Sequence, residues 1–205
     1  EITIGLPKSL TAACGVDALT HCIEAYTVQL HQPITDALAL KGISMIAENL
    51  EKAYENGEDR EARRNMMIAS TIGGMAFISS NVGAVHAFAE TVGAWFDTPH
   101  GVACAMMLPI VMEYNADCTG EKYREIARAM GVEGVDAMSQ EEYRKAAVAA
   151  VRKLSEDVGI PSKLEAIKES DLDFLAESAH ADACAPGNPK DASVEDLKEL
   201  FRKIM

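Results

Sequence analysis

Positive charge is scarce in this sequence of 205 residues. It holds 19 lysines and arginines against 32 aspartates and glutamates, which gives a net charge of −13. Binding to nucleic acid needs a basic surface that neutralises phosphates and releases their counterions, so the composition excludes a nucleic-acid-binding protein. The same deficit excludes a basic amphipathic anchor for a membrane surface. We expect an acidic surface that keeps copies of the protein apart in water.

Long apolar runs are also missing. Although 48% of the residues are apolar, no uninterrupted apolar run reaches the roughly 20 residues that span a bilayer, which excludes a transmembrane protein. The first residues, Glu1 to Ile4, include neither an initiator methionine nor the basic and apolar regions of a signal peptide. We therefore expect a cytoplasmic protein, and a fragment of a longer chain.

Paired cysteines are absent as well. The five cysteines form no Cys-x-x-Cys motif, and their odd number prevents complete pairing. We expect reduced thiols, as in the cytoplasm, and no separate structural zinc site. The cysteines are Cys14, Cys22, Cys104, Cys118 and Cys184.

The pattern of apolar residues predicts an all-α protein. Ile2, Ile4 and Leu6 alternate with polar residues and predict at most one short N-terminal strand. From Pro7 onward the periodicity is helical, with eight or nine helical segments. The sequence has no alternation of strands and helices, no Gly-x-Gly-x-x-Gly motif, no repeat and no linker. We therefore expect a single helical domain over residues 1–205.

Some helices can be described more closely. Met66 to Ile78 is apolar nearly all round and contains Gly73-Gly74, which predicts a buried helix with another backbone packed closely against it. Asn56-Gly57 marks the end of the preceding helix. Capping boxes, which mark helix starts, are expected at Ser139 with Glu142 and at Ser193 with Asp196.

Asp17 and His21 are the first candidate metal ligands. They lie four residues apart in helical sequence, so both side chains project from one face of the helix. A carboxylate and an imidazole at this spacing can chelate one divalent ion. Taken alone, the pair fits better with a solvated aspartate beside a hydrogen-bonded histidine, because short motifs often match by chance.

His86 and His100 add two further imidazoles. His86 lies among small apolar residues, which indicates burial and is also the setting of an ordinary core histidine. His100 stands between Pro99, which restricts the backbone, and Gly101, which allows another chain to come close. In that position it is either a metal ligand or a helix-capping residue.

Taken together, one carboxylate and three imidazoles predict a transition-metal site. This donor set suits Fe(II), Zn(II) or Co(II) rather than Mg(II) or Ca(II). It leaves the metal a net positive charge and an open position for a substrate oxygen, as a Lewis-acid site requires. His31 and His180 have no companion at chelating spacing and are interpreted as surface or locally hydrogen-bonded residues.

Three stretches resemble the signatures of the iron-dependent (group III) alcohol dehydrogenases and occur in that family's order. The first runs from Leu10 to Tyr26, the second from Val85 to Cys104, and the third from Cys184 to Leu197. His86 and His100 are 14 residues apart, like the last two metal ligands of the family. The resemblance covers essentially the whole chain.

The resemblance implies both a fold and a chemistry. It implies the helical C-terminal domain of the dehydroquinate synthase-like and iron alcohol dehydrogenase type, with the active site facing an N-terminal nucleotide-binding domain that is absent from this chain. It implies hydride transfer between a primary or secondary alcohol and NAD or NADP, in a homo-oligomer. Fe(II) is the metal that the family implies, and the ligand types permit Zn(II) about as well. The metal ligands would be Asp17, His21, His86 and His100, and Phe77, Val82 and Cys184 would line or adjoin the substrate pocket.

Glu90 departs from the pattern of the family. Many members carry a second histidine four residues after the position of His86, whereas this chain has Glu90 there. If Glu90 faces the metal, it is a proton acceptor or it holds a metal-bound water. The alternative is that it points toward solvent or a basic side chain.

Two other functions stay open at this stage. One is a polyol (glycerol-type) dehydrogenase or a dehydroquinate synthase-like enzyme, which share the architecture and a divalent metal. The other is a non-catalytic helical module that binds a metal. Without the nucleotide-binding domain, we expect the chain alone not to oxidise alcohols.

Overall fold

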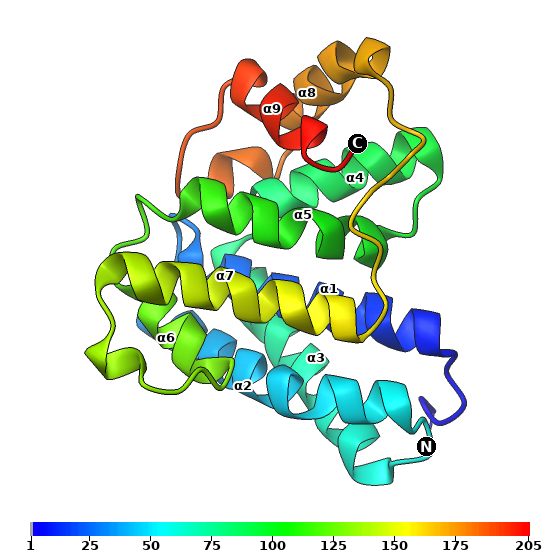
Figure 1. Ribbon diagram of the computed structural model, residues 1–205, viewed down its shortest axis with the longest axis vertical. Helices are drawn as coiled ribbons and strands as arrows, with labels where there is room; N and C mark the ends of the chain where they lie inside the picture. Colours follow the sequence, from blue (N-terminus) through cyan, green and yellow to red (C-terminus); the bar gives the residue numbers. More distant parts are fainter. Residues whose placement is uncertain (1) are drawn as a thin grey trace.

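The structure is a computed structural model that describes residues 2–205 (Figure 1). Within these residues it contains nine α-helices, three short 3-10 helices and no β-strand, which confirms the all-α class. The α-helices are α1 (Lys8–Thr27), α2 (Pro33–Glu55), α3 (Arg60–Ser80), α4 (Ala84–Phe96), α5 (His100–Asn115), α6 (Lys122–Ala129), α7 (Gln140–Asp157), α8 (Leu172–Ala181) and α9 (Val194–Arg202), and the 3-10 helices are η1 (Val135–Ala137), η2 (Glu169–Asp171) and η3 (Ala185–Gly187).

The predicted helix boundaries are confirmed. Helix α2 ends at Glu55, followed by Asn56 as its C-terminal cap. Both capping boxes form. The Ser139 hydroxyl accepts the backbone N–H of Glu142 at 3.4 Å, and the Ser193 hydroxyl accepts that of Asp196 at 3.1 Å. Each cap satisfies a backbone donor that has no partner within its own helix.

The short N-terminal strand that the sequence allowed does not form. Residues 2–5 form a turn in which the N–H of Leu6 donates to the carbonyl oxygen of Thr3 at 3.2 Å. Gly5 closes the turn with a φ of +88°, in the left-handed region that glycine tolerates. A strand needs a neighbouring strand to pair its backbone groups, and residues 2–205 contain none.

Helix α1 lies at the centre of the packing. It contacts α2 and α3 on one side and α5 on another, while α4 packs along α5. Helices α8 and α9 pack on each other and α8 packs on α4, whereas α7 packs against both α5 and α6 (Figure 1). One buried cluster of apolar side chains runs through these helices. It includes Phe88 of α4 and Phe201 of α9, whose rings meet edge to face at 4.4 Å.

Helix α3 is buried on one face only, which corrects the expectation of a helix buried on every side. Its inner face packs against α1, where a Cβ on Gly73 would lie 3.4 Å from the carbonyl oxygen of Ala18. On its outer face Met75 is 55% exposed and Ile78 is 80% exposed. An all-round apolar pattern cannot specify which side is covered, because that depends on the neighbouring elements.

No single helix within residues 2–205 is long and apolar enough to cross a bilayer. Helices α3 and α4 meet those criteria only when they are taken together, and the chain bends by 105° between them.

Candidate metal centre

Helix α1 supplies two of the candidate ligands. Asp17 and His21 lie together as their spacing predicts, and Nδ1 of His21 is 2.9 Å from the backbone carbonyl oxygen of Asp17. A carbonyl oxygen only accepts hydrogen bonds, so we assign the proton to Nδ1, which leaves the lone pair of Nε2 free. The ring of Phe77 from α3 packs on that of His21, with 4.4 Å between the ring centroids.

The first turn of α4 supplies the third candidate, His86. The chain turns between α3 and α4 at Asn81, which has a φ of 73° and a ψ of −176°, a backbone conformation that residues other than glycine rarely adopt. This turn brings His86 to α1. Its Nε2 atom lies 3.1 Å from Nε2 of His21 and 3.8 Å from Oδ1 of Asp17.

The first residue of α5 is the fourth candidate, His100. Its Nε2 atom lies 3.5 Å from Oδ1 of Asp17 and 3.5 Å from Sγ of Cys104, one turn further along α5. The side chain of His100 is 44% exposed, whereas that of His86 is 5% exposed. The cluster is therefore buried on the side of α4 and open on the side of α5.

A single oxygen lies at the centre of this cluster. Oδ1 of Asp17 is buried and accepts no hydrogen bond within residues 2–205. Nε2 of His86 and Nε2 of His100 lie within 3.8 Å of it. Nδ1 of His21 is also 3.8 Å away, but the free nitrogen of that ring, Nε2, lies 3.1 Å from Nε2 of His86. A buried carboxylate oxygen without a partner is costly, and a cation held between it and the imidazoles would offset that cost. The donors present therefore fit a divalent transition metal.

The surrounding charges also favour a cation. Burial, and then the nearby His86, lower the pKa of His21 below its usual value of 6.5, so this ring is neutral at pH 7. Burial also lowers the pKa of His86, but the charge and hydrogen bond of Glu24 and the charge of Asp17 outweigh it and raise the pKa overall. Two carboxylates thus make the cluster electronegative in a largely buried setting.

Sequence reasoning missed two residues of the cluster. Cys104 offers a sulfur that lies, with donor atoms of Asp17, His86 and His100, in a group whose atoms are all within 4.8 Å of one another. Its spacing of four residues from His100 was the available signal. Burial raises the pKa of this thiol well above its usual value, so it is protonated at pH 7. The second is Glu24, which bonds to His86 and follows Asp17 and His21 on the same face of α1.

The other predicted site residues lie around the cluster. Phe77 contacts His21, Val82 is buried at the turn before α4, and Cys184 is half-buried just before η3. Glu90 is exposed one turn after His86, and its charge raises the pKa values of both His86 and Cys104. Glu90 forms no ion pair within residues 2–205, so the alternative in which it pairs with a basic side chain is not seen there.

Asn188 holds the C-terminal loop against the start of α4. Its side chain exchanges hydrogen bonds with that of Asn115 at 2.8 Å and 2.9 Å. It also accepts the N–H of Ala84 at 3.4 Å. Gly187 packs on the turn before α4, where an added Cβ would lie 2.2 Å from the carbonyl oxygen of Val82. Cys184 lies three residues before Gly187, close enough to Glu90 and Glu24 for their charges to raise the pKa of its thiol.

The remaining histidines lie elsewhere, as expected. His31 is 3.0 Å from a carboxylate oxygen of Asp36, and His180 is 3.1 Å from the carbonyl oxygen of Ala192. Both are local, exposed contacts. The five cysteines are all unpaired, as their number and spacing predict.

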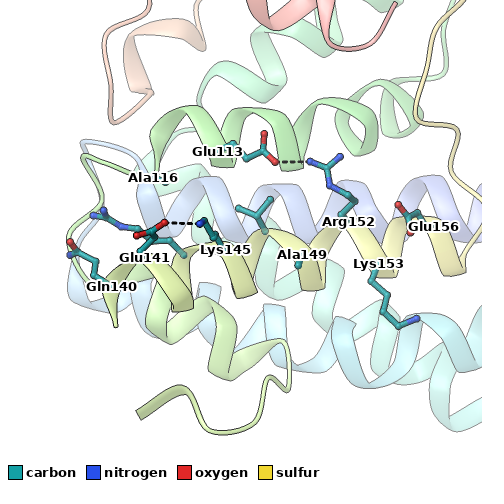
Figure 2. Close-up of a pocket in the computed structure, with 11 residues that line it drawn as sticks. Glu113, Ala116, Gln140, Glu141, Lys145, Ala149, Arg152, Lys153 and Glu156 are labelled. Carbon is teal, nitrogen blue, oxygen red and sulfur yellow. Dashed lines mark hydrogen bonds and ion pairs between the residues drawn. The ribbon is translucent and has the colours of Figure 1, made fainter. Parts of the chain in front are cut away.

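A groove lies apart from the cluster, between α5 and α7 (Figure 2). It has a volume of about 660 Å³ and none of the candidate site residues lines it. Ion pairs cross or border it, such as that between Arg152 and Glu113 at 2.8 Å. A second pair joins Lys145 and Glu141, whereas the buried oxygen of Asp17 has no such partner.

Comparison with known proteins gives a family match over most of the chain. Residues 11–205 match the model of the Fe-containing alcohol dehydrogenase family, C-terminal. Over 96% of its length the chain is 48% identical to lactaldehyde reductase of Escherichia coli K12, of which it covers 51%. Over 98% of its length it is 43% identical to 1,3-propanediol dehydrogenase of Klebsiella pneumoniae, of which it covers 52%.

A solved structure gives the same fold. The crystal structure of a 1,3-propanediol oxidoreductase superposes with a TM-score of 0.96 at 42% identity, over 98% of this chain and 53% of the other. This match confirms the helical architecture that the resemblance implied. The chain spans about half the length of the curated relatives that it matches.

Proposed function

Since this chain belongs to the Fe-containing alcohol dehydrogenase family, we propose that it is the metal-binding helical catalytic domain, residues 1–205, of an enzyme that interconverts alcohols and aldehydes or ketones. The nicotinamide cofactor, NAD or NADP, would be held by an N-terminal domain that lies outside this chain. The relatives support this proposal, because their names describe oxidation of a diol or reduction of a hydroxyaldehyde. Those names favour hydride transfer over a lyase reaction.

The single observation that carries the proposal is the unpartnered oxygen of Asp17. It is buried, and three imidazoles from three helices surround it. Asp17, His21, His86 and His100 would hold Fe(II), the metal that the family name states, and the same donors also accept Zn(II). A divalent ion bound there supplies Lewis acidity toward the oxygen of an alcohol or a carbonyl compound.

The chain's own side chains would bind the substrate and accept its proton. Phe77, whose ring packs on that of His21, and Val82, at the turn before α4, would offer apolar surface to a small aliphatic alcohol. Cys184, half-buried in the loop that Asn188 holds, would border the same pocket. Glu90, exposed one turn after His86, would take the proton of the alcohol and pass it to solvent.

Metal analysis tests the ligand set. The chain is purified without oxygen, loaded with Fe(II) or Zn(II), and its bound metal is measured. We expect stoichiometric metal in the parent and a loss of it in Asp17→Ala and His86→Ala, whereas His31→Ala and His180→Ala retain it. Equal metal in the parent and in both ligand variants would refute the four-ligand site.

Turnover of the complete enzyme tests Glu90. If this carboxylate accepts the proton, Glu90→Gln lowers turnover and removes its ionisation from the pH profile of kcat. An unchanged profile and rate would show that Glu90 has no part in proton transfer.

A further inference from the structure

Glu24 is a buried carboxylate at the end of α1 that the reaction outlined above does not use. Its side chain is 6% exposed. One oxygen, Oε2, lies 2.5 Å from Nδ1 of His86, and the other, Oε1, accepts the backbone N–H of Val85 at 2.8 Å. Burial of a carboxylate is costly unless hydrogen bonds compensate for the lost water, and here both oxygens of Glu24 have partners on α4.

The contact with Val85 makes Glu24 a cap for α4. Helix α4 begins after Gly83, which has no side chain with which to cap the first turn. A Cβ on Gly83 would lie 3.1 Å from Oε1 of Glu24, so glycine leaves room for the carboxylate at this point. The N-terminus of a helix carries partial positive charge, which stabilises an anion there. The first turn of α4 thus holds Glu24 in place.

The contact with His86 determines which ring nitrogen carries the proton. A carboxylate only accepts hydrogen bonds, so Nδ1 of His86 must donate to Glu24. Nε2 is then left with its lone pair directed at the cluster, 3.1 Å from Nε2 of His21. His21 is held in the same tautomer by the backbone carbonyl oxygen of Asp17. Both imidazoles therefore present a lone pair, rather than a proton, to the same point.

We propose that Glu24 is a positioning residue that holds His86 in its Nδ1–H tautomer and fixes the ring, so that its Nε2 is ready to bind the metal. The inference rests on the proposed function, because the metal gives this tautomer its purpose. The principle is general, since the carboxylate partner of a ligating histidine orients it and increases its basicity.

Glu24→Gln is the sharpest variant because it keeps the shape of the side chain. Two N–H groups, of Val85 and His86, point at the two oxygens of Glu24. A glutamine has one oxygen and one NH2 group, so its NH2 group must face one of these two N–H donors, with which it cannot form a hydrogen bond. If the NH2 group faces His86, Nδ1 becomes the acceptor and the proton moves to Nε2, where it blocks the metal.

The first measurement uses the metal-free chain. Nitrogen-15 NMR of the histidine side chains, at a pH where the rings are neutral, distinguishes the two tautomers of His86. The signals of His86 are assigned as those that disappear in His86→Gln. We expect the Nδ1–H form in the parent and the Nε2–H form, or a mixture, in Glu24→Gln. An Nε2–H form in the parent would overturn the inference, whether or not any variant folds.

The second measurement is the affinity for Zn(II) in competition with a chelator. We expect Glu24→Gln to bind about 10- to 100-fold more weakly than the parent. The matched control is Asp36→Asn, which removes a carboxylate from another histidine, His31, away from the cluster. This control is expected to leave Zn(II) affinity unchanged.

The outcomes separate this inference from the proposed function. If the parent binds no Zn(II) or Fe(II), the proposed function fails, and the NMR measurement still shows whether Glu24 determines the tautomer of His86. If the parent binds metal and Glu24→Gln binds it equally well, the inference fails while the metal centre stands.

Discussion

Gly101 and Ala13 are in contact through their backbones. A Cβ on Gly101 would lie 2.4 Å from the carbonyl oxygen of Ala13, a distance that side-chain carbons do not adopt. Gly101 directly follows His100 at the start of α5, and Ala13 precedes Asp17 by one turn of α1. This contact brings the two helices together at the point where His100 lies 3.5 Å from Asp17.

We predict that Gly101→Ala disturbs the metal centre. The added methyl group must push α5 away from α1, which costs about 1–3 kcal/mol of unfolding free energy, as overpacking generally does. It also moves His100 and weakens Zn(II) binding. Denaturant unfolding and chelator competition measure the two effects.

Gly74→Ala is the matched control for that variant. It also lies in a helix, α3, but an added Cβ has no atom within 4 Å. Alanine stabilises a helix interior by about 0.5–1 kcal/mol relative to glycine. Equal effects of the two substitutions would show that the contact with Ala13 does not matter.

We predict that Arg63 holds the N-terminal turn on the bundle. Its buried guanidinium donates to the hydroxyl of Thr11 at 2.7 Å, and to the carbonyl oxygens of Gly57 at 3.0 Å and Leu6 at 3.2 Å. Lysine cannot reproduce this planar set of donors, so Arg63→Lys leaves buried acceptors without partners. The expected loss is about 1–3 kcal/mol of unfolding free energy.

The neighbouring Arg64 provides the comparison for Arg63. It is exposed, and Arg64→Lys is expected to change the unfolding free energy by no more than about 0.5 kcal/mol. Denaturant unfolding of both variants tests the prediction. It is wrong if Arg63→Lys is as stable as Arg64→Lys.

We predict that the capping box at Ser193 stabilises α9 in a pH-dependent way. Ser193→Ala removes the hydroxyl that accepts the N–H of Asp196, which costs about 1 kcal/mol for a typical cap. In the parent, hydrogen bonds from Ser193 lower the pKa of Asp196 below its usual value of 3.8. The stability that the ionised Asp196 contributes through these bonds is present above pH 3.8 and is lost as the pH falls through the lowered pKa. The difference in unfolding temperature between the parent and Ser193→Ala, measured from pH 6 down to pH 2, should therefore be smaller at the acid end.

We predict that Cys184 reacts slowly with iodoacetamide at pH 8. Burial, followed by the hydrogen bond and charge of Asp182, raises the pKa of the thiol from 9.0 to about 12. The reactive species is the thiolate, whose fraction at pH 8 is then roughly 1000-fold below that of an ordinary cysteine. Asp182→Asn removes the charge and should accelerate alkylation, as mass spectrometry of the labelled peptide measures. Labelling of Cys184 at the rate of free cysteine would contradict the raised pKa.

Much of the fold could be predicted because its determinants are local. The capping boxes at Ser139 and Ser193 need only a spacing of three residues, and both form. The N-terminal turn could not be predicted from Ile2 and Ile4, because an alternating pattern indicates a strand only where another strand pairs with it. The exposure of the outer face of α3 could not be predicted for a related reason. The apolar character of a residue such as Ile78 does not specify whether another element covers it.

The candidate site also has features that are local in sequence and features that depend on the tertiary structure. The sequence by itself determined the types of donor, because Asp17 and His21 share a helix face at a spacing of four residues. Only the tertiary structure decided that Glu24 meets His86, which lies 62 residues further along the chain. Helix periodicity specifies which side chains share a face, whereas contacts between helices depend on how their backbones approach, as at Gly101. For that reason the candidate ligands could be named from the sequence, while the residue that orients one of them became visible only in the fold.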